Sequence, residues 1–216
     1  MTLILACGLK REARILERPG RDVRAVVGGG VAAKLEADLD EVAGMFPGLV
    51  MSCGIAGALD PSLLPGDLVI DGDAALVEHL RRALPQAVQG RIVGSDTIVA
   101  TTAAKRALAD RTGGVAVDME SHVAARVAKR RNLPFAAIRT ISDRAGDDLP
   151  AAALVGMRPD GGMALGAVLG SLARAPGQLP DLLRTGRQAD AAFRSLDKMF
   201  EAIIHAGIDR LDISTL

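Results

Sequence analysis

The sequence predicts an α/β fold in which helices cover both faces of a central sheet. Short apolar runs, several of them ended by glycine, alternate with segments of helical periodicity. The runs are apolar throughout, which is typical of strands buried on both faces. A length of 216 residues with 49% hydrophobic and 24% charged residues suits one soluble domain. We therefore expect a single domain over 1–216, built as three α/β/α layers with a mostly parallel or mixed sheet.

The first half of the chain supplies most of the expected elements. Gly8 and the glycines at 28–30 end two apolar runs, and Val31, Leu35 and Leu39 recur at helical spacing. These patterns predict strands at 2–8, 23–27, 49–53 and 67–70, and helices at 9–18, 31–45 and 74–84.

The second half continues the alternation of strands and helices up to about residue 149, where the sequence pattern changes. We expect short strands at 91–93 and 114–117, helices at 102–110 and 120–131, and an apolar strand at 135–141. From about residue 149 the region diverges, with a loop at 157–162, an apolar helix at 163–173 broken at Pro176 and Pro180, and one or two amphipathic helices at 181–206. This tail either covers a sheet face or lines an apolar substrate channel.

Charge and composition restrict the partners. Lys plus Arg equals Asp plus Glu at 26 each, so no net field attracts nucleic acid or an anionic membrane. Aromatic residues make up only 2% of the chain, which argues against a platform that stacks single-stranded bases. The sequence has no apolar run of spanning length and no signal-peptide pattern, since charges begin at Lys10. We expect a cytoplasmic protein that binds no nucleic acid.

The cysteines and histidines offer no metal or thiol chemistry. Cys7 and Cys53 lie inside apolar runs without metal-ligand spacing, and none of the three histidines is obviously paired with either. The expectation is two buried, reduced thiols and no metal site.

Two acidic motifs carry the most information about function. In Val117-Asp118-Met119-Glu120-Ser121, a carboxylate stands at the start of a helix; in Arg139-Thr140-Ile141-Ser142-Asp143, a second follows an apolar strand. Cleavage of a glycosidic C–N bond needs one acid that stabilises a cationic sugar and another that protonates the leaving base. Structural roles stay open: Asp143 and Asp118 as helix caps, and Glu120 as a partner of the helix dipole.

These motifs closely resemble the signature of the purine nucleoside phosphorylase and methylthioadenosine/S-adenosylhomocysteine nucleosidase superfamily, and the order of elements is similar over residues 1 to about 146. The resemblance implies that Asp143 protonates the purine and that Glu120 binds the ribose hydroxyls, with Met119 against the sugar. A strand, Gly8 and then Glu12 resemble the start of the nucleosidases, where the glutamate activates water.

The resemblance also implies the remaining substrate contacts. Gly30, and Ala56 with Gly57, belong to two glycine-rich loops on the nucleophile and ribose side; Ile98 and Val99 meet the purine edge beside Ser142. The chain departs from the family where Ile55 replaces a serine, where Ile98 replaces an aromatic residue, and in a shorter 71–91 region. Residues 28–33 also fit a loose dinucleotide fingerprint, so a dinucleotide-dependent oxidoreductase is an alternative.

Over its whole length the chain looks closest to the hopanoid-associated phosphorylases. The segments 53–61, 133–139, 158–161 and 178–180 carry this likeness. It implies release of adenine from adenosylhopane, with water or inorganic phosphate as co-substrate and no other cofactor. A homodimer is expected, and transient membrane contact is left open. A general methylthioadenosine/S-adenosylhomocysteine nucleosidase and a non-catalytic nucleoside-binding module are the other readings.

Overall fold

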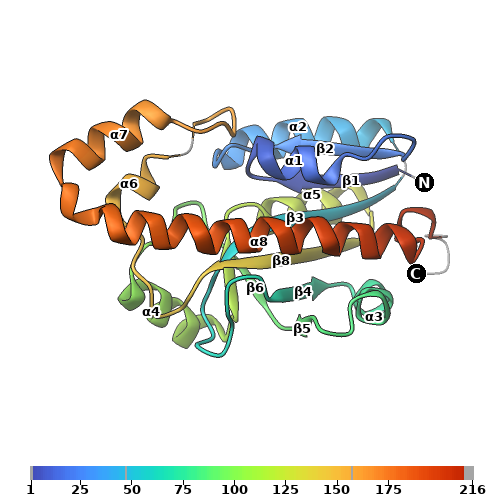
Figure 1. Ribbon diagram of the computed structural model, residues 1–216. Helices are drawn as coiled ribbons and strands as arrows, with labels where there is room; N and C mark the ends of the chain where they lie inside the picture. The colour runs from blue at the N-terminus through green and yellow to red at the C-terminus, as the bar shows by residue number, and fades with distance from the viewer. Residues whose placement is uncertain (1, 47, 157, 212–216) are drawn as a thin grey trace.

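The structure, a computed structural model, describes residues 2–46, 48–156 and 158–211 (Figure 1). Its strands are β1 Thr2–Cys7, β2 Val23–Val27, β3 Gly48–Ala58, β4 Leu68–Gly72, β5 Val88–Gln89, β6 Ile92–Gly94, β7 Ala116–Asp118 and β8 Phe135–Asp143. Its α-helices are α1 Lys10–Leu16, α2 Ala32–Met45, α3 Ala74–Ala83, α4 Thr102–Thr112, α5 Ser121–Arg131, α6 Ala151–Leu154, α7 Leu165–Arg174 and α8 Leu179–His205, with 3₁₀ turns η1 Pro176–Gln178 and η2 Ile208–Arg210.

All the strands join one mixed sheet. Along the main path the order is β2-β1-β3-β8-β4-β5, and β7 pairs with both β3 and β6. The pairs that hold β1, β2, β3 and β8 together are parallel, whereas β4 runs antiparallel to β8 and β7 antiparallel to β3. The parallel strands therefore end at one edge of the sheet, where ligands of α/β folds bind.

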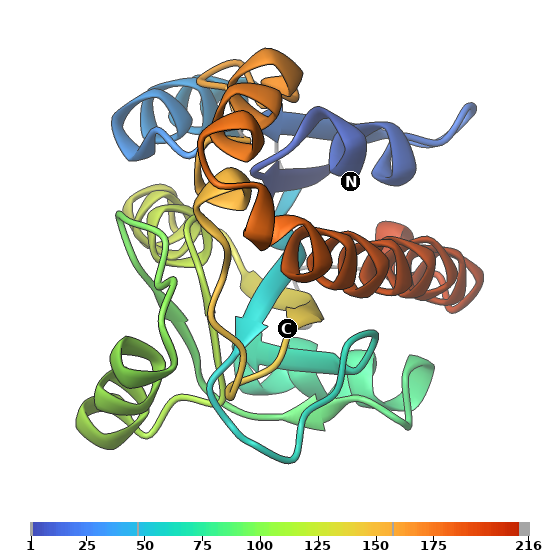
Figure 2. The same cartoon turned by 60° about the vertical axis from the view of Figure 1, so that its left-hand side comes forward.

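Helices cover both faces of this sheet. Side chains of α1, α3 and α8 pack with alternate residues of β1, β3, β4 and β8 in one buried cluster. The opposite residues of β1 and β3 pack against α2 and α5 in a second cluster. Figures 1 and 2 show α8 crossing one face, with α2 and α5 behind the sheet. This arrangement confirms the predicted three-layer α/β/α fold.

Several predicted boundaries were wrong. The run expected to end at Cys53 continues as strand to Ala58, because Gly54 to Ala58 pair with β8 and β7. Likewise β8 extends through Asp143, and the short strand β5 was missed. Pro180 does not break the last helix, since it occupies the first turn of α8, where its missing N–H costs nothing. The first residue of the predicted 157–162 loop lies outside the described residues.

Only the last part of the region after residue 149 packs against the sheet. No residue of α7 is buried, and burial in α8 begins at Ala192. We call residues 163–185 the apolar arm; its exposed large side chains are Met163, Leu165, Leu169, Leu179 and Leu183. The arm lies beyond the edge of the sheet at which the parallel strands end (Figure 1). Among the described residues, no helix is both long and apolar enough to cross a bilayer.

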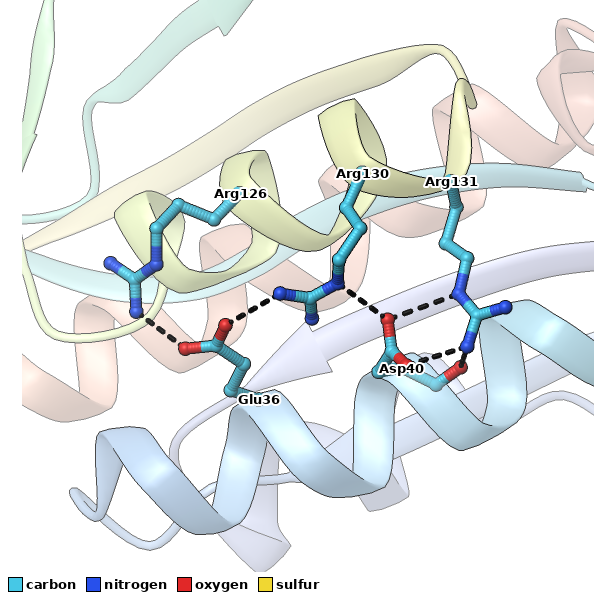
Figure 3. Close-up of polar contacts among 5 residues, drawn as sticks. All are labelled: Glu36, Asp40, Arg126, Arg130 and Arg131. Atoms are coloured by element: carbon cyan, nitrogen blue, oxygen red, sulfur yellow. Dashed lines mark hydrogen bonds and ion pairs between the residues drawn. The ribbon is translucent and has the colours of Figure 1, made fainter.

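An ion-pair network ties α2 to α5 on the outer surface (Figure 3). Glu36 accepts hydrogen bonds from Arg126 at 2.7 Å and Arg130 at 2.9 Å. Asp40 accepts from Arg130 Nε and Arg131 Nε, both at 3.0 Å. The network holds α5, which begins directly after Glu120, against α2.

Candidate active site

A cavity of about 190 Å³ opens where the parallel strands end. Its walls come from the β1–α1 turn, the second half of β3, the 97–99 loop, the β7–α5 turn and the end of β8. It brings together nine of the ten site residues predicted from sequence: Glu12, Ala56, Gly57, Ile98, Val99, Met119, Glu120, Ser142 and Asp143. Leu9, Thr97 and Leu149 also line it, in addition to these nine residues.

Gly30 is the predicted residue that does not line the cavity. Its loop is covered by the segment around Pro159: a Cβ on Gly29 would overlap the Pro159 carbonyl oxygen, and Gly29 N–H donates to Gly8 O at 3.0 Å. Both Gly29 and Gly30 have positive φ, at 63° and 72°. The glycines of this loop therefore make a tight turn under the 158–161 segment, which explains their presence without a ligand.

Glu12 is held by the backbone rather than by a cation. Gly8 N–H and Leu9 N–H donate to its Oε2, and Ile55 N–H donates to its Oε1, all at 2.8 Å. Only 2% of the residue is exposed. Burial raises the pKa of Glu12, while Arg139 and these three hydrogen bonds act in the opposite direction. The three donors fix the carboxylate at the base of the cavity.

Arg139 lies beneath the acids and was quoted in the motif without a predicted role. The residue is fully buried on β8 and donates from Nη2 to Ser52 Oγ at 2.5 Å. The same nitrogen pairs with Asp118 and lies 3.4 Å from Glu120 Oε2. Asp118 also accepts from Ser121 N–H at 3.0 Å, so it caps α5 as expected and in addition balances the arginine.

The cluster holds more acid than base. Glu12, Asp118 and Glu120 surround one guanidinium, and full ionisation would leave two uncompensated charges away from water. Burial raises the pKa of Glu120 to about 8; Arg139 opposes this shift, and Asp118 and Glu12 add to it. This environment favours the neutral form of Glu120, which can both donate to and accept from a sugar diol.

Asp143 ends β8 with both carboxylate oxygens engaged. Ser142 Oγ donates to Oδ1 at 2.8 Å, and Lys105 Nζ donates to Oδ2 at 2.5 Å. Lys105 is fully buried, and it also donates to the carbonyl oxygens of Arg144 at 2.7 Å and Asp147 at 2.9 Å. The sequence analysis missed this residue, because a lysine in a short polar helix gives no signal of burial.

The cysteines take no part in this site. Both are buried free thiols, as predicted. Burial raises the pKa of Cys53 to about 12 and moves that of Cys7 in the same direction, so neither is a nucleophile at neutral pH. Among the described residues, no group of three or more His, Cys, Asp or Glu side chains is arranged to hold a metal ion.

The chain is similar in part to a known protein family. The family described as "Phosphorylase superfamily" matches residues 71–169, just under half of the chain, and these contain Met119, Glu120 and Asp143. No curated protein sequence matches the chain.

Solved structures match over nearly the whole length. The 5'-methylthioadenosine/S-adenosylhomocysteine nucleosidase of Neisseria meningitidis, in complex with methylthio-immucillin-A, is 19% identical, with a TM-score of 0.66 over 94% of this chain and 98% of that one. The putative nucleosidase of Borrelia burgdorferi B31 bound to adenine is 12% identical, at 0.67 over 94% and 99%. The futalosine hydrolase of Helicobacter pylori is 16% identical, at 0.59 over 93% and 97%. At these identities the likeness establishes the fold.

Proposed function

We propose that the protein cleaves the N-ribosidic bond of an adenine nucleoside and releases the free base. The observation that carries the proposal is the convergence of Glu12, Glu120 and Asp143 on one cavity at the ends of the parallel strands. The match to the phosphorylase superfamily and the similarity to nucleosidase structures support a nucleoside-cleaving hydrolase or phosphorylase. These three acids are also the groups that the chemistry requires.

In the proposed reaction each acid has one task. Asp143 gives a proton to N7 of the purine, so that the protonated base accepts the electrons of the breaking C1'–N9 bond and leaves as neutral adenine. Glu120 hydrogen-bonds the ribose hydroxyls as the sugar becomes oxocarbenium-like, with Met119 against its apolar face. Glu12 orients the nucleophile and takes its proton.

We propose water rather than phosphate as the nucleophile. The described residues that line the cavity include Glu12, Asp118, Glu120 and Asp143 but no Lys, Arg or His. The backbone N–H groups that a phosphate would use, those of Gly8, Leu9 and Ile55, already donate to Glu12. A phosphate dianion would therefore meet acids and no cation in the wall of the cavity, whereas water carries no charge to be repelled.

For the substrate we propose adenosylhopane, whose 5' substituent is a large lipid. Leu9 and Leu149 line the cavity, and the apolar arm beside this end of the sheet exposes Leu165 and Leu169, each 64% accessible. An apolar substituent that covered these side chains would remove them from water, which is favourable by roughly 25 cal/mol per Å². A general methylthioadenosine nucleosidase is the competing assignment, because small 5' groups need no such surface.

The deciding experiment measures adenine by chromatography after incubation with adenosylhopane or methylthioadenosine, each with and without phosphate. We expect release from adenosylhopane that does not depend on phosphate. Release only in the presence of phosphate would make the protein a phosphorylase, and preference for methylthioadenosine would make it a general nucleosidase.

The Asp143→Asn variant separates an enzyme from a nucleoside-binding module. Asparagine keeps the size of the side chain and removes its acidic proton, so we expect turnover to fall by at least about 10²-fold while adenine still binds. If the wild-type protein binds adenine nucleosides without releasing base from any of them, the binding module is the correct reading.

A further inference from the structure

We propose that Lys105 is a positioning residue that holds Asp143 in place and receives it as a carboxylate once its proton has gone to the base. The inference rests on the proposed function, since it assigns a partner to the general acid. It concerns a side chain from α4, an element that supplies none of the residues of the expected catalytic set.

The packing of α4 singles out this lysine. Lys105 is the one residue of the 102–112 helix that is buried, and its side chain is fully inaccessible. A helix normally anchors itself through apolar side chains, and burying an ammonium costs several kcal/mol per ion unless it is paired and hydrogen-bonded. All three N–H donors of Lys105 are used, on Asp143 Oδ2 and on the Arg144 and Asp147 carbonyl oxygens.

These contacts fix both the acid and the loop behind it. The carbonyl contacts tie the turn after β8 to α4, and Asp147 in that turn accepts from Gln188 of α8 at 2.8 Å. The Asp143 carboxylate therefore has one oxygen on Lys105 and the other on Ser142, with no freedom to rotate away from the cavity.

The pairing with Lys105 favours the product form of the acid. The ammonium on Oδ2 stabilises the carboxylate that follows proton donation, while Ser142 Oγ lies 2.8 Å from Oδ1 and 3.1 Å from the Ala56 carbonyl oxygen. In the catalytic cycle the Asp143 O–H bond breaks, an N7–H bond forms, and the ribosyl C1'–N9 pair goes to the base. The remaining carboxylate is then stabilised by Lys105, and it must take a proton from solvent before or as the next purine binds.

Several other charged groups lie near the Lys105–Asp143 pair. Glu12, Asp118 and Glu120 lie across the cavity, Arg144 and Asp147 follow in the turn, and Asp148 accepts from Thr102 at the start of α4. Lys105 is the only cation that pairs with Asp143 among the described contacts, so its removal leaves the carboxylate without an ion-pair partner there.

The first test compares leaving groups. Lys105→Met should slow release of adenine by at least about tenfold, a part of the 10²–10⁴ that general acid catalysis supplies. The same variant should cleave p-nitrophenyl β-D-ribofuranoside at close to the wild-type rate, because nitrophenolate departs without protonation. Lys105→Arg should restore much of the adenine release. Equal losses on both substrates would reduce Lys105 to a structural role and overturn the proposal.

The second test needs no turnover. Adenine binding is measured by calorimetry at pH 7 in two buffers of different ionisation enthalpy, beside 7-deazaadenine, which lacks N7. Wild-type protein should take up about one proton more with adenine than with 7-deazaadenine, because the Asp143 carboxylate must be protonated to bind N7. In Lys105→Met this difference should vanish, whereas the control Arg106→Met, at an exposed position of the same helix, should retain it.

The outcomes of the two proposals are separable. If the wild-type protein takes up the proton and releases no adenine, and Lys105→Met loses the uptake difference, the proposed function is overturned and the pairing of Lys105 with Asp143 is supported. Wild-type protein that releases adenine while the uptake difference is unchanged in Lys105→Met overturns the role of Lys105 alone. Failure of the wild-type protein to bind adenine overturns both, since Asp143 then faces no purine.

Discussion

Each acid of the cavity has a different environment, and that difference assigns its task. Glu12 accepts three backbone hydrogen bonds, Glu120 lies among other acids near a single guanidinium, and Asp143 is paired with an ammonium. The backbone donors partly offset the burial that raises the pKa of Glu12, whereas the neighbouring acids add to the burial that raises the pKa of Glu120. One cavity therefore presents a hydrogen-bond donor for the sugar beside two further acids that are held in different surroundings.

Glu120 should make the protein less stable as pH rises. Its pKa is about 8 in the folded chain against 4.5 as the ordinary value. Between these values the unfolded chain releases a proton that the folded chain keeps. The contribution of Glu120 to the free energy of unfolding is therefore fully present below pH 4.5, and it is lost as pH rises to 8. The slope is about 1.4 kcal/mol per pH unit.

The Glu120→Gln variant provides the measurement. Glutamine does not titrate, so denaturant unfolding at pH 5 to 9 should give a flatter profile than the wild-type protein. Some slope should persist, because the pKa of Glu12 is raised too. The exposed Glu41→Gln substitution on α2 should leave the profile unchanged. An identical slope in Glu120→Gln and wild type would show that Glu120 is ionised in the folded protein.

The site residues show how far motif and resemblance reach. Glu12, Glu120 and Asp143 were predicted from their motifs and from the family resemblance, and the parallel strands do bring the three positions to one edge of the sheet. Lys105 and Arg139 were not given roles, since only the folded chain shows that these two cations are inaccessible. Gly30 was placed at the site because a glycine-rich turn suggests a ligand, yet here the turn accommodates the chain itself.

At the scale of elements, the glycines of β3 were mistaken for a loop. Gly54 and Gly57 lie within the strand, and they are small because side chains of the site pass close to them. A Cβ on Gly54 would overlap Glu12 Oε1 and lie 2.5 Å from Arg139 Nη1. Sequence patterns do not distinguish a glycine that bends the chain from one that makes room for a neighbour.

Two glycine substitutions should therefore act in opposite directions. Gly54→Ala should destabilise the fold by roughly 1–3 kcal/mol and impair the site, because Glu12 and Arg139 have nowhere to move. Gly186→Ala, at an exposed position of α8 with nothing within 4 Å of the new methyl group, should stabilise by roughly 0.5–1 kcal/mol. Chemical denaturation checks both, and a neutral Gly54→Ala would contradict the close packing of this strand.

The network between α2 and α5 should respond to salt. Arg131 and Arg130 lower the pKa of Asp40 to about 2, which reports a favourable interaction of the charged form (Figure 3). Asp40→Asn should lower the melting temperature at low ionic strength, and the deficit should shrink as salt screens the Asp40 pairs of the wild-type protein. The exposed Asp110→Asn on α4 is the control; a deficit that is independent of salt would indicate lost packing instead.

At the scale of the whole molecule, the domain and its layers were predictable because buried parallel strands have a distinctive apolar pattern. The packing of the region after residue 149 was not predictable, since the sequence of an amphipathic helix shows which face is apolar but not what covers that face. In α8 the carboxyl-terminal half covers the sheet through Phe193, Leu196 and Phe200, whereas the amino-terminal half belongs to the exposed arm. One helix thus joins a structural part to a part free for other contacts.

The arm supplies the last prediction. If it receives the lipid of adenosylhopane, the combined substitutions Leu165→Gln, Leu169→Gln and Leu183→Gln should raise KM for that substrate and leave methylthioadenosine kinetics unchanged, since no arm residue lines the cavity. Each leucine is more than half exposed, so stability should change by no more than about 0.5 kcal/mol per site. Met45→Gln, at an exposed apolar side chain on α2, is the matched control.

The same variant tests the expected homodimer. Light scattering of the wild-type protein and the triple variant shows whether the leucines hold two copies together. A fall to monomer with unaltered KM for adenosylhopane would assign the arm to self-association and contradict its role in lipid binding. A selective rise in KM at constant mass would instead show that the exposed leucines contact the substrate, because their loss affects only a ligand that extends from the cavity to the arm.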